Sequence, residues 1–333
     1  MGSIDSYSTG WIAPIFAERA AALAVLDEHH DEPENFDQHP SDKNAYSWGR
    51  MGKHNIVIAS LPDGIQGVVS AAVTVSNLLA SLPDIKIGLL VGIGGGVPSL
   101  DNDIRLGDIV VSRPSSGSGG VIQYDFVKAK VDNQFEPKGV LNNPPSVLLN
   151  ALAKLRAHHM IKPSRIPAIL EAMWEANPLT KKPRKGGPGF VHQGFDNDRL
   201  FSPECIHAGG ENCDDCEASK EVQRDARDTT DPEIHYGIIA SGNALVKDAV
   251  FRDEIAKACG KDCFCVEMEA AALMNNFPCL VIRGICDYAD SHKNDRWQPY
   301  ASATAAAFAK ELLEHVPIPQ LQKTPGFRAL QSS

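Results

Sequence analysis

Apolar residues recur along the chain with two different spacings. Nearly continuous apolar runs at 55–59, 85–91 and 279–282 are typical of strands that helices cover on both faces. Further strands are predicted at 10–14, 109–112 and 234–240. Helical spacing of apolar residues predicts helices at 17–28, 68–81, 146–159, 165–174, 266–275 and 299–315. Because strands and helices alternate, we predict an α/β fold around a mixed central β-sheet.

Three segments interrupt this alternation. Residues 29–44 are polar and are predicted to form a surface loop. Between residues 178 and 231 the regular spacing fades, and so long a stretch inside a domain indicates an irregular insertion. Residues 317–333 are polar and are predicted to form a flexible tail. We therefore expect a single domain over residues 1–333, with its core in about 10–160 and 232–316.

Charge and composition exclude several classes of protein. Lys and Arg number 32 against 42 Asp and Glu, a net charge of −10, so nucleic-acid binding is not expected. No apolar run reaches the ~18 residues that cross a membrane, and Met1–Gly10 lacks the features of a signal peptide. All eight cysteines lie at or after Cys205, several in apolar surroundings, which indicates buried reduced thiols. We expect a cytoplasmic protein with no membrane partner.

A cluster of glycines, Gly92–Gly96 with Gly94 at its centre, follows the apolar run that ends at Val91. Glycines at such a point let a ligand approach backbone N–H groups closely. The spacing matches neither a dinucleotide-binding fingerprint nor a P-loop. A tight turn between the strand and the next loop is the alternative interpretation.

Two carboxylates flank a thioether in Val266-Glu267-Met268-Glu269. A carboxylate accepts two hydroxyl hydrogen bonds at once, which suits a vicinal diol such as ribose, and a sulfur can lie against a sugar face. The alternative is a helix start, because acids in a first turn interact favourably with the helix dipole.

Two further acids are candidates for proton transfer. Asp287 follows a predicted buried strand, at the strand end where α/β folds place catalytic groups, and desolvation there would raise its pKa as a general acid requires. Its alternative role is to cap a helix or a turn. Glu18 lies on the first predicted helix, where a solvent-facing position is the commonest fate of a Glu.

Taken in order, six segments resemble the nucleoside phosphorylase superfamily. They are Gly10–Glu18, Gly92–Gly96, Ile104–Ser112, Ser241–Val246, Val266–Ala270 and Arg283–Asp290. The resemblance is to the branch of hexameric purine nucleoside phosphorylases and methylthioadenosine/S-adenosylhomocysteine nucleosidases, and to fungal members, some fused to immune-receptor-like modules. It covers roughly residues 10–160 and 232–316. It implies a twisted mixed β-sheet, partly barrel-like and flanked by helices, and cleavage of an N-glycosidic bond.

The resemblance also implies a role for each matching residue. Asp287 corresponds to the acid that assists departure of the base at purine N7. Met268 and Glu269 correspond to the residues that hold the ribose, and Glu267 supports them. Gly94 lies in the glycine segment of the substrate site. Leu245 and Val246 match the positions that pack on the base, although an aromatic residue is usual at the first of these.

The nucleophile distinguishes the two branches of the family. Leu90 and Ile93 stand where phosphorylases have an Arg and a Ser for phosphate, and both are apolar. Glu18 falls where nucleosidases have the Glu that deprotonates water, and a carboxylate would repel phosphate. We therefore predict a purine nucleosidase that releases free base and ribose from purine ribonucleosides. Ile93 also replaces a serine that steadies the water in nucleosidases, which is a departure from that branch.

Two other functions stay open from the sequence alone. The first is a phosphate-dependent purine nucleoside phosphorylase, for which Arg19 would bind phosphate if the helix register differs by one. The second is a nucleoside-sensing module without turnover. In each reading the partner is a small-molecule nucleoside and catalysis needs no cofactor. Ile15 and Phe16 would flank the 5′ group of the substrate. In relatives, a neighbouring subunit contributes side chains that close the pocket, so the resemblance implies a homo-oligomer, a dimer or larger.

A separate group of metal-ligand residues lies in the predicted insertion. Cys205, His207, Cys213 and Cys216 have the spacing C-x-H-x5-C-x2-C, and C-x2-C is the usual half-site of a structural zinc. The segment has little apolar content to stabilise it, and a bound metal could supply the missing stability. A cluster of free thiols in a loop is the alternative interpretation.

Overall fold

The computed structural model describes residues 3–115, 117–129, 135–182, 187–210 and 212–327. Its strands are β1 Tyr7–Ile12, β2 Glu28–His30, β3 Ser47–Met51, β4 His54–Ala59, β5 Ile87–Gly96, β6 Ile109–Ser112, β7 Val121–Gln123, β8 Val127–Ala129, β9 Phe135–Pro137, β10 Ile234–Ser241, β11 Cys263–Glu267 and β12 Cys279–Asp287. Its α-helices are α1 Phe16–Ala24, α2 Val68–Ser81, α3 Ser146–His159, α4 Ile166–Ala176, α5 Ala249–Cys259, α6 Ala270–Leu273, α7 Gln298–Leu313 and α8 Ile318–Lys323.

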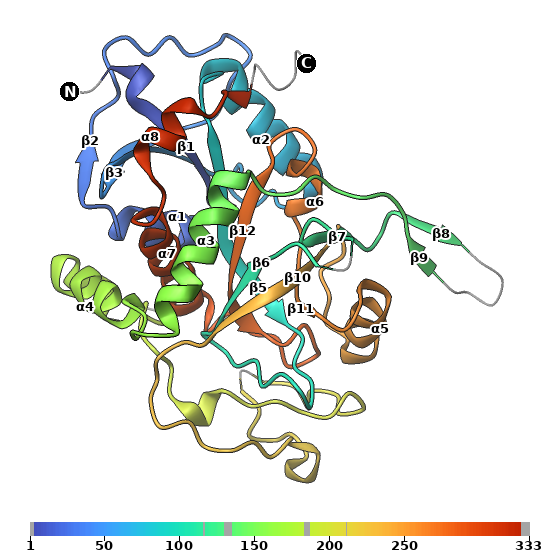
Figure 1. The fold of residues 1–333 in the computed structure, drawn as a ribbon. Coiled ribbons are helices and arrows are strands. Elements are labelled where there is room, and N and C mark those ends of the chain that lie inside the picture. The colour runs from blue at the N-terminus through green and yellow to red at the C-terminus, as the bar shows by residue number, and fades with distance from the viewer. Residues whose placement is uncertain (1–2, 116, 130–134, 183–186, 211, 328–333) are drawn as a thin grey trace.

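The main sheet is mixed and closes partly on itself. Its strand order is β11-β10-β6-β12-β5-β1-β4-β3-β2, and a further pairing joins β11 to β5. That pairing, in which Cys265 lies opposite Gly96 and Val266 opposite Gly95, closes β5, β12, β6, β10 and β11 into a ring. From β5 the sheet continues through β1, β4, β3 and β2, whereas β7 pairs with β10, and β8 and β9 form a separate two-stranded sheet (Figure 1). The predicted α/β fold with a mixed, partly barrel-like sheet is confirmed.

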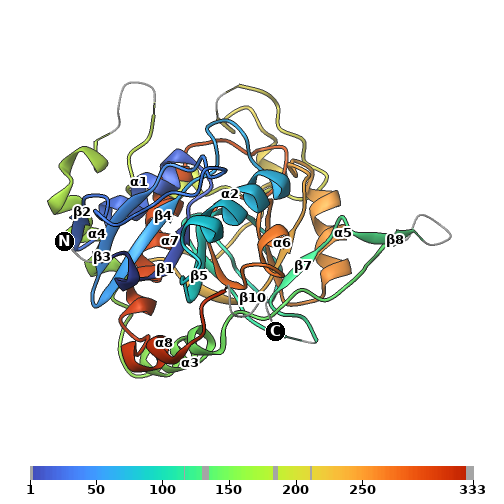
Figure 2. The ribbon, with the colours of Figure 1, turned by 90° about the horizontal axis from the view of Figure 1, so that it is seen from above.

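Two groups of helices bury the two faces of the sheet. Apolar side chains of α1, α3, α4 and α7 share one core cluster with one face. Those of α2 and α6 share a second cluster with the opposite face (Figure 2). The alanine-rich helix α7 comes so close to β12 that a Cβ on Gly284 would overlap the backbone of Ala301. Small residues on both elements therefore let the central helix pack directly on the central strand.

One alternative interpretation and one prediction near the ring differ from the structure. The glycines of Gly92–Gly96 do not form a turn, because β5 continues through them and pairs with β12 and β11. Residues 266–275 were expected to be one helix, but β11 runs to Glu267 and only Ala270–Leu273 is helical. In both cases pairing with neighbouring strands overrides the local pattern, which contains no information about distant partners.

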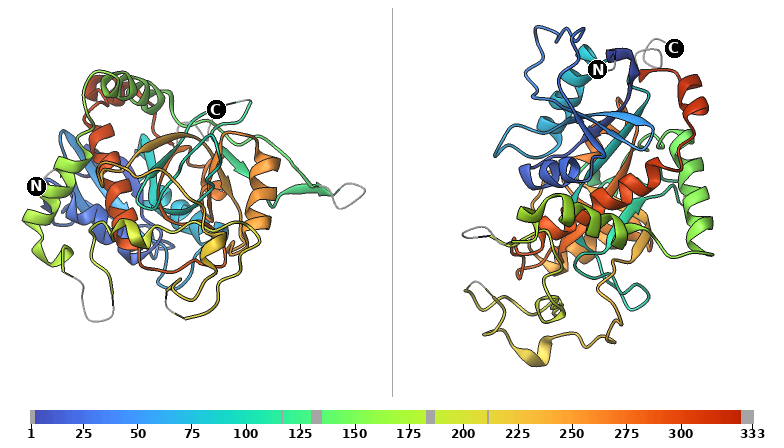
Figure 3. Two further views of the ribbon diagram at one scale, coloured as in Figure 1. Left: turned by 90° about the horizontal axis from the view of Figure 1, so that it is seen from below. Right: turned by 90° about the vertical axis from the view of Figure 1, so that its left-hand side faces the viewer.

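The segments outside the core are irregular in different ways. Among the described residues of 178–231, regular structure is limited to the 3-10 helices Pro178–Thr180, Phe195–Asn197 and Ala218–Lys220 and a bridge between Phe201 and Glu221. This stretch lies at the lower end of the molecule, away from both termini (Figure 3). The stretch expected to be a flexible tail contains α8, and Leu321 and Phe327 are buried because they are apolar and pack on the core. Residues 328–333 lie outside the described part.

The cysteines and the helices agree with two expectations from composition. All eight cysteines are free thiols, and all but Cys213 are buried. Within the described part of the chain, no helix has both the length and the apolar character needed to cross a membrane.

Candidate active site

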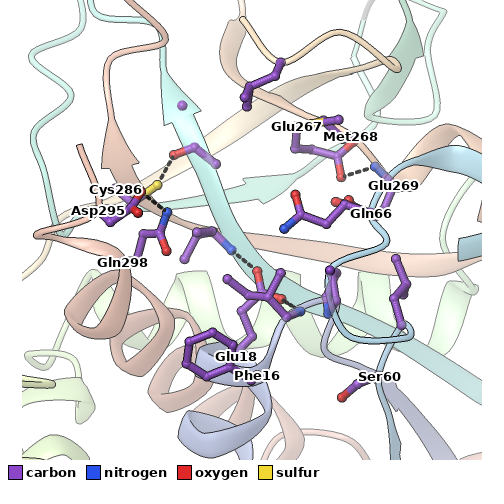
Figure 4. A pocket seen from close by; sticks show the side chains of 18 of the residues that line it. Phe16, Glu18, Ser60, Gln66, Glu267, Met268, Glu269, Cys286, Asp295 and Gln298 are labelled. Atoms are coloured by element: carbon purple, nitrogen blue, oxygen red, sulfur yellow. Dashed lines mark hydrogen bonds between the residues drawn. The ribbon is translucent and has the colours of Figure 1, made fainter. Parts of the chain in front are cut away.

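A cavity of about 900 Å³ opens where β5, β11 and β12 meet the start of α1. Residues from the loop after β4, from 244–247 and from 286–298 complete its wall. All of the predicted catalytic and substrate-binding residues line it: Glu18, Gly94, Leu245, Val246, Glu267, Met268, Glu269 and Asp287. Figure 4 shows Glu18 entering from one side and the Glu267–Glu269 group from another.

Glu18 is held as the third residue of α1 and is only 4% exposed. Its Oε2 accepts the N–H of Ile15 at 2.7 Å, which caps the helix start, and its Oε1 accepts the N–H of Ile93 at 2.7 Å. Burial raises the pKa of Glu18 to about 8, while nearby Arg283 and the two N–H groups act in the opposite direction. The solvent-facing alternative is wrong, and the side chain is a desolvated carboxyl poised to exchange a proton near neutral pH.

Arg283 on β12 links three carboxyl groups beneath the cavity. Its Nη2 donates to Glu267 and, at 3.2 Å, to Glu269, and its Nη1 lies 3.8 Å from Glu18 Oε1. The residue is 1% exposed, and burial would lower its pKa, but the carboxylates raise it above the usual value. Arg283 was not among the residues that the sequence motifs pointed to. An arginine inside an otherwise apolar strand was the available signal, because a buried charge requires partners.

Glu267 and Glu269 have different surroundings. The Glu267 carboxylate accepts the N–H groups of Glu269 and Ala270, each at 3.1 Å, and so caps the start of α6. Glu269 accepts the N–H of Gly67 at 3.2 Å through Oε1, and burial raises its pKa. Helix capping and diol binding were alternatives in the sequence; Glu267 makes the capping contacts, and both Glu267 and Glu269 line the cavity.

Asp287 ends β12 and is 4% exposed. Its carboxylate accepts hydrogen bonds from the N–H of Ala289 at 2.8 Å and from the thiol of Cys286 at 3.0 Å, and it forms an ion pair with Lys293. Burial would lower the pKa of Lys293, but Cys286 and Asp287 raise it above the usual value. Lys293 could not be identified from the sequence, because it lies in a polar loop with no motif around it.

The glycines of β5 make room for these groups. A Cβ on Gly92 would overlap the side chains of Glu18 and Arg283, and one on Gly95 would lie 3.0 Å from Asp287 Oδ1. The glycine segment therefore lets catalytic candidates from other elements lie directly against a strand. Gly94 faces the cavity between them.

The residues expected to bind the base, and those at the positions that bind phosphate in phosphorylases, have different surroundings in the structure. Val246 is buried in the cavity wall, whereas Leu245 lines the mouth and is 56% exposed. Leu90 is fully buried in the core on the α2 side and does not line the cavity, but Ile93 does. Arg19 also lines it, and its Nη2 donates to Ser47 Oγ at 2.8 Å.

The predicted zinc ligands lie outside this cavity. His207, Cys213 and Cys216 come together, with their candidate ligand atoms within 4.8 Å of one another. Cys205 does not belong to this group of ligand atoms, but it packs beside Cys216 and Phe201 in a small buried cluster.

No protein-family model matches the sequence. The chain is 45% identical over 311 residues to a nucleotide-binding leucine-rich repeat (NLR)-like protein of Hyaloscypha variabilis, which covers 93% of this chain and 29% of that protein. It is 23% identical to a death domain-containing ATP nucleosidase of Amphimedon queenslandica, over 80% of this chain and 41% of that protein. A shorter match, 34% identical over 87 residues, is to the ATP nucleosidase Cap17 of Escherichia coli, covering 25% of this chain and 17% of that protein. The chain spans less than half the length of these relatives.

Two solved enzymes illustrate the architecture that this chain shares with known structures. Futalosine hydrolase of Helicobacter pylori has a TM-score of 0.56 and 16% identity, covering 93% of this chain and 98% of that one. S-adenosylhomocysteine nucleosidase from Streptococcus pyogenes, in complex with 5-methylthiotubericidin, has a TM-score of 0.56 and 19% identity, covering 96% and 99%. At these identities the likeness establishes the fold.

Proposed function

We propose, from the nucleoside phosphorylase fold that this chain has, that it is a purine nucleosidase which hydrolyses the N-glycosidic bond of purine ribonucleosides. The products are free base and ribose. The observation that carries the proposal is Glu18, a buried carboxyl with a raised pKa that shares one cavity with Glu269 and Asp287. In this proposal Glu18 deprotonates water, Glu269 accepts hydrogen bonds from the ribose diol, and Asp287 assists departure of the purine.

In this mechanism Glu18 takes the proton of water as its oxygen bonds to C1′. The N–H groups of Ile15 and Ile93 hold the carboxylate in place, since each occupies a different oxygen. The transition state has oxocarbenium character, and the carboxylates of Glu267 and Glu269, which outnumber the guanidinium of Arg283, stabilise its positive charge while Glu18 takes up the proton. Glu269 accepts the 2′ and 3′ hydroxyls, and Met268 contacts the sugar face.

Base departure is assigned to Asp287 and Lys293. Electrons of the breaking C1′–N9 bond move into the purine, which becomes basic at N7. Lys293 holds a proton in contact with Asp287 and can pass it through that carboxyl to N7. Each such acid or base role is worth ~10²–10⁴ in rate.

Water is favoured over phosphate by the charges beneath the cavity. When ionised, Glu18, Glu267 and Glu269 leave a net negative cluster after Arg283 is counted, which repels a phosphate dianion at C1′. Phosphorolysis is the second candidate, because Arg19 lines the same cavity. A sensing module without turnover would not need a desolvated base such as Glu18.

The cavity also suits a purine nucleotide. Its volume is near the upper end of the range typical of small-molecule pockets, roughly 300–1,000 Å³, and the cations Arg19, Lys43 and Lys247 line it. Two relatives are named ATP nucleosidases. We therefore include ATP among the substrates, with the phosphates directed toward these cations.

A second copy of the chain is the proposed partner. Phe16 at the cavity mouth is 78% exposed, and Val69 and Val73, one turn apart on α2, are 72% and 55% exposed. Large apolar side chains in such positions are typical of a surface that a neighbour covers. Free thiols throughout are consistent with a reducing compartment, and we place the protein in the cytoplasm.

The test is an assay of the purified chain with inosine, guanosine, adenosine and ATP, with and without phosphate, reading free base and ribose or ribose phosphate separately. Release of base without phosphate is expected. Strict dependence on phosphate would select the phosphorylase, and binding of nucleosides without turnover would select the sensing module. Arg19→Gln should raise KM for ATP more than for adenosine if the phosphates lie against Arg19.

A further inference from the structure

The irregular segment between α4 and β10 contains a compact set of soft metal ligands. A ring nitrogen of His207 and the sulfurs of Cys213 and Cys216 lie within 4.8 Å of one another. In a tetrahedral site with Zn–S bonds of about 2.3 Å, two sulfur ligands lie about 3.8 Å apart. The three atoms are therefore near the separations that a shared ion would impose.

Cys205 lies beside this triad. Its side chain packs with Cys216 and Phe201 in a small buried cluster, against which Cys213 also packs. Its Sγ lies 3.9 Å from Nε2 of His292, at a distance that suits an N–H donor facing a sulfur. Cys205 is thus a buried thiol with a polar partner already directed at it.

The hydrogen bonds of His207 favour the tautomer that a ligand needs. Its Nε2 lies 2.9 Å from the carbonyl of Asn212, which can only accept, so the proton belongs on Nε2. The lone pair is then on Nδ1, which accepts the N–H of Gly209 at 3.1 Å. Metal-bound histidines commonly donate their second N–H to a carbonyl in this way. A metal on Nδ1 would replace the exposed Gly209 contact.

Apolar packing inside this segment is sparse. In the described part of 199–221, the buried apolar cluster consists of Phe201, Cys205 and Cys216. Such a segment has little to offset its loss of conformational entropy on folding, and a structural metal supplies that free energy in many small modules. We propose that Cys205, His207, Cys213 and Cys216 bind one structural Zn²⁺ in tetrahedral geometry. Three thiolates and one imidazole match the preference of this ion.

The site would be tied to the active-site loop. The N–H of His207 donates to Ser291 Oγ at 3.0 Å, and Ser291 Oγ lies 3.4 Å from the carbonyl of Cys205. His292, which faces the Cys205 sulfur, directly precedes Lys293, the partner of Asp287. These contacts connect the proposed zinc site to the loop between Asp287 and Lys293.

The first experiment measures metal in the full chain purified without chelator, and again after incubation with Zn²⁺ and removal of the excess. About one equivalent is expected, and Co²⁺ in its place should give the absorption of a tetrahedral thiolate site. The variant C213S/C216S should lose the metal, whereas C259S, a buried cysteine outside the cluster, should keep it. A wild-type chain that binds no more zinc than C213S/C216S would overturn the proposal, whether or not that variant folds.

Two further variants decide the fourth ligand. Cys205→Ser should lose most of the zinc, and His292→Ala should keep it, since His292 contacts the sulfur without binding the ion. The reverse result would overturn the assignment of Cys205. Limited proteolysis should cut the zinc-depleted chain faster within 199–221, and equal cutting of both forms would overturn the ordering role. Metal content and proteolysis need no substrate, so they remain informative if the proposed nucleosidase activity is absent.

Discussion

Nη1 of Arg283 lies 3.8 Å from Oε1 of Glu18, although the two residues come from the last strand and the first helix of the chain. The same guanidinium also pairs with Glu267 and Glu269. One buried cation thus compensates three buried acids. Four predictions about the reaction and one about stability follow from this arrangement and from Asp287.

Arg283→Met should destabilise the fold by about 3–5 kcal/mol, because it leaves buried carboxylates without their counter-charge. The measurement is denaturant unfolding of the variant and the wild type. Arg50→Met is the matched control: the Arg50–Glu28 pair is exposed, so its loss should cost only about 0–1 kcal/mol. Equal effects of the two substitutions would contradict the central role of Arg283.

Glu18→Ala should lower kcat by ~10²–10⁴-fold and change KM little, because the lost interaction forms mainly in the transition state. Steady-state kinetics without phosphate give both constants. Glu171→Gln, an exposed change on α4, should leave them unaltered. Rescue of the Glu18 variant by phosphate would argue for phosphorolysis, and Arg19 would then be the residue to test as the phosphate ligand.

The pH dependence follows from the raised pKa of Glu18, about 8. Only the carboxylate can accept a proton from water, so kcat/KM should rise as pH increases toward 8 and level off above it. The same shift acts on stability with the opposite sign. The folded state holds a proton that the unfolded carboxyl, with a pKa near 4.5, has released, so the contribution of Glu18 falls as pH rises through this interval. A flat kcat/KM between pH 6 and about 8 would exclude Glu18 as the base.

Glu269→Gln should reduce kcat/KM for purine ribonucleosides more than for 2′-deoxyribonucleosides. A carboxylate that accepts two hydroxyl hydrogen bonds loses more when both hydroxyls are present. The readout is the ratio of kcat/KM values for adenosine and 2′-deoxyadenosine in each protein. If the ratio does not change, the diol is bound elsewhere.

Asp287→Asn and Lys293→Met should each lower kcat by ~10²-fold or more, since both belong to one proton path. The double variant should then be little worse than either single variant, because residues that act as a unit are not additive. Lys257→Met on the exposed side of α5 is the control. Additive losses would place Lys293 outside the path of the proton.

Much of the site was accessible from the sequence because short motifs mark the strand ends that form it. Asp287 and Glu269 follow apolar runs and Glu18 follows the first strand, and the resemblance of the six ordered segments to the nucleoside phosphorylase superfamily brought them together as a group. All of them line one cavity. The direction of their hydrogen bonds was not accessible, and neither was the division of labour between Glu267 and Glu269.

The missed features depend on contacts between segments far apart in the chain. Arg283 acquires its role only where β12 faces α1 and β11, and Lys293 only where its loop folds back on Asp287. β5 extends through Gly92–Gly96 because it pairs with β12 there. The local glycine content, taken alone, argues against a strand. Helix spacing at 266–275 was likewise overridden by the pairing of Val266 with Gly95.

β12 comes last among the strands in sequence but lies between β5 and β6 in the ring. During synthesis, the ring therefore cannot close until β12 has been made and has inserted between β5 and β6. Arg283 and Asp287 lie on that same strand, so insertion of β12 closes the ring and also brings Arg283 to Glu18 and Asp287 to the cavity. A nascent chain that has not yet emerged as far as β12 would therefore lack both residues and could not carry out the proposed reaction.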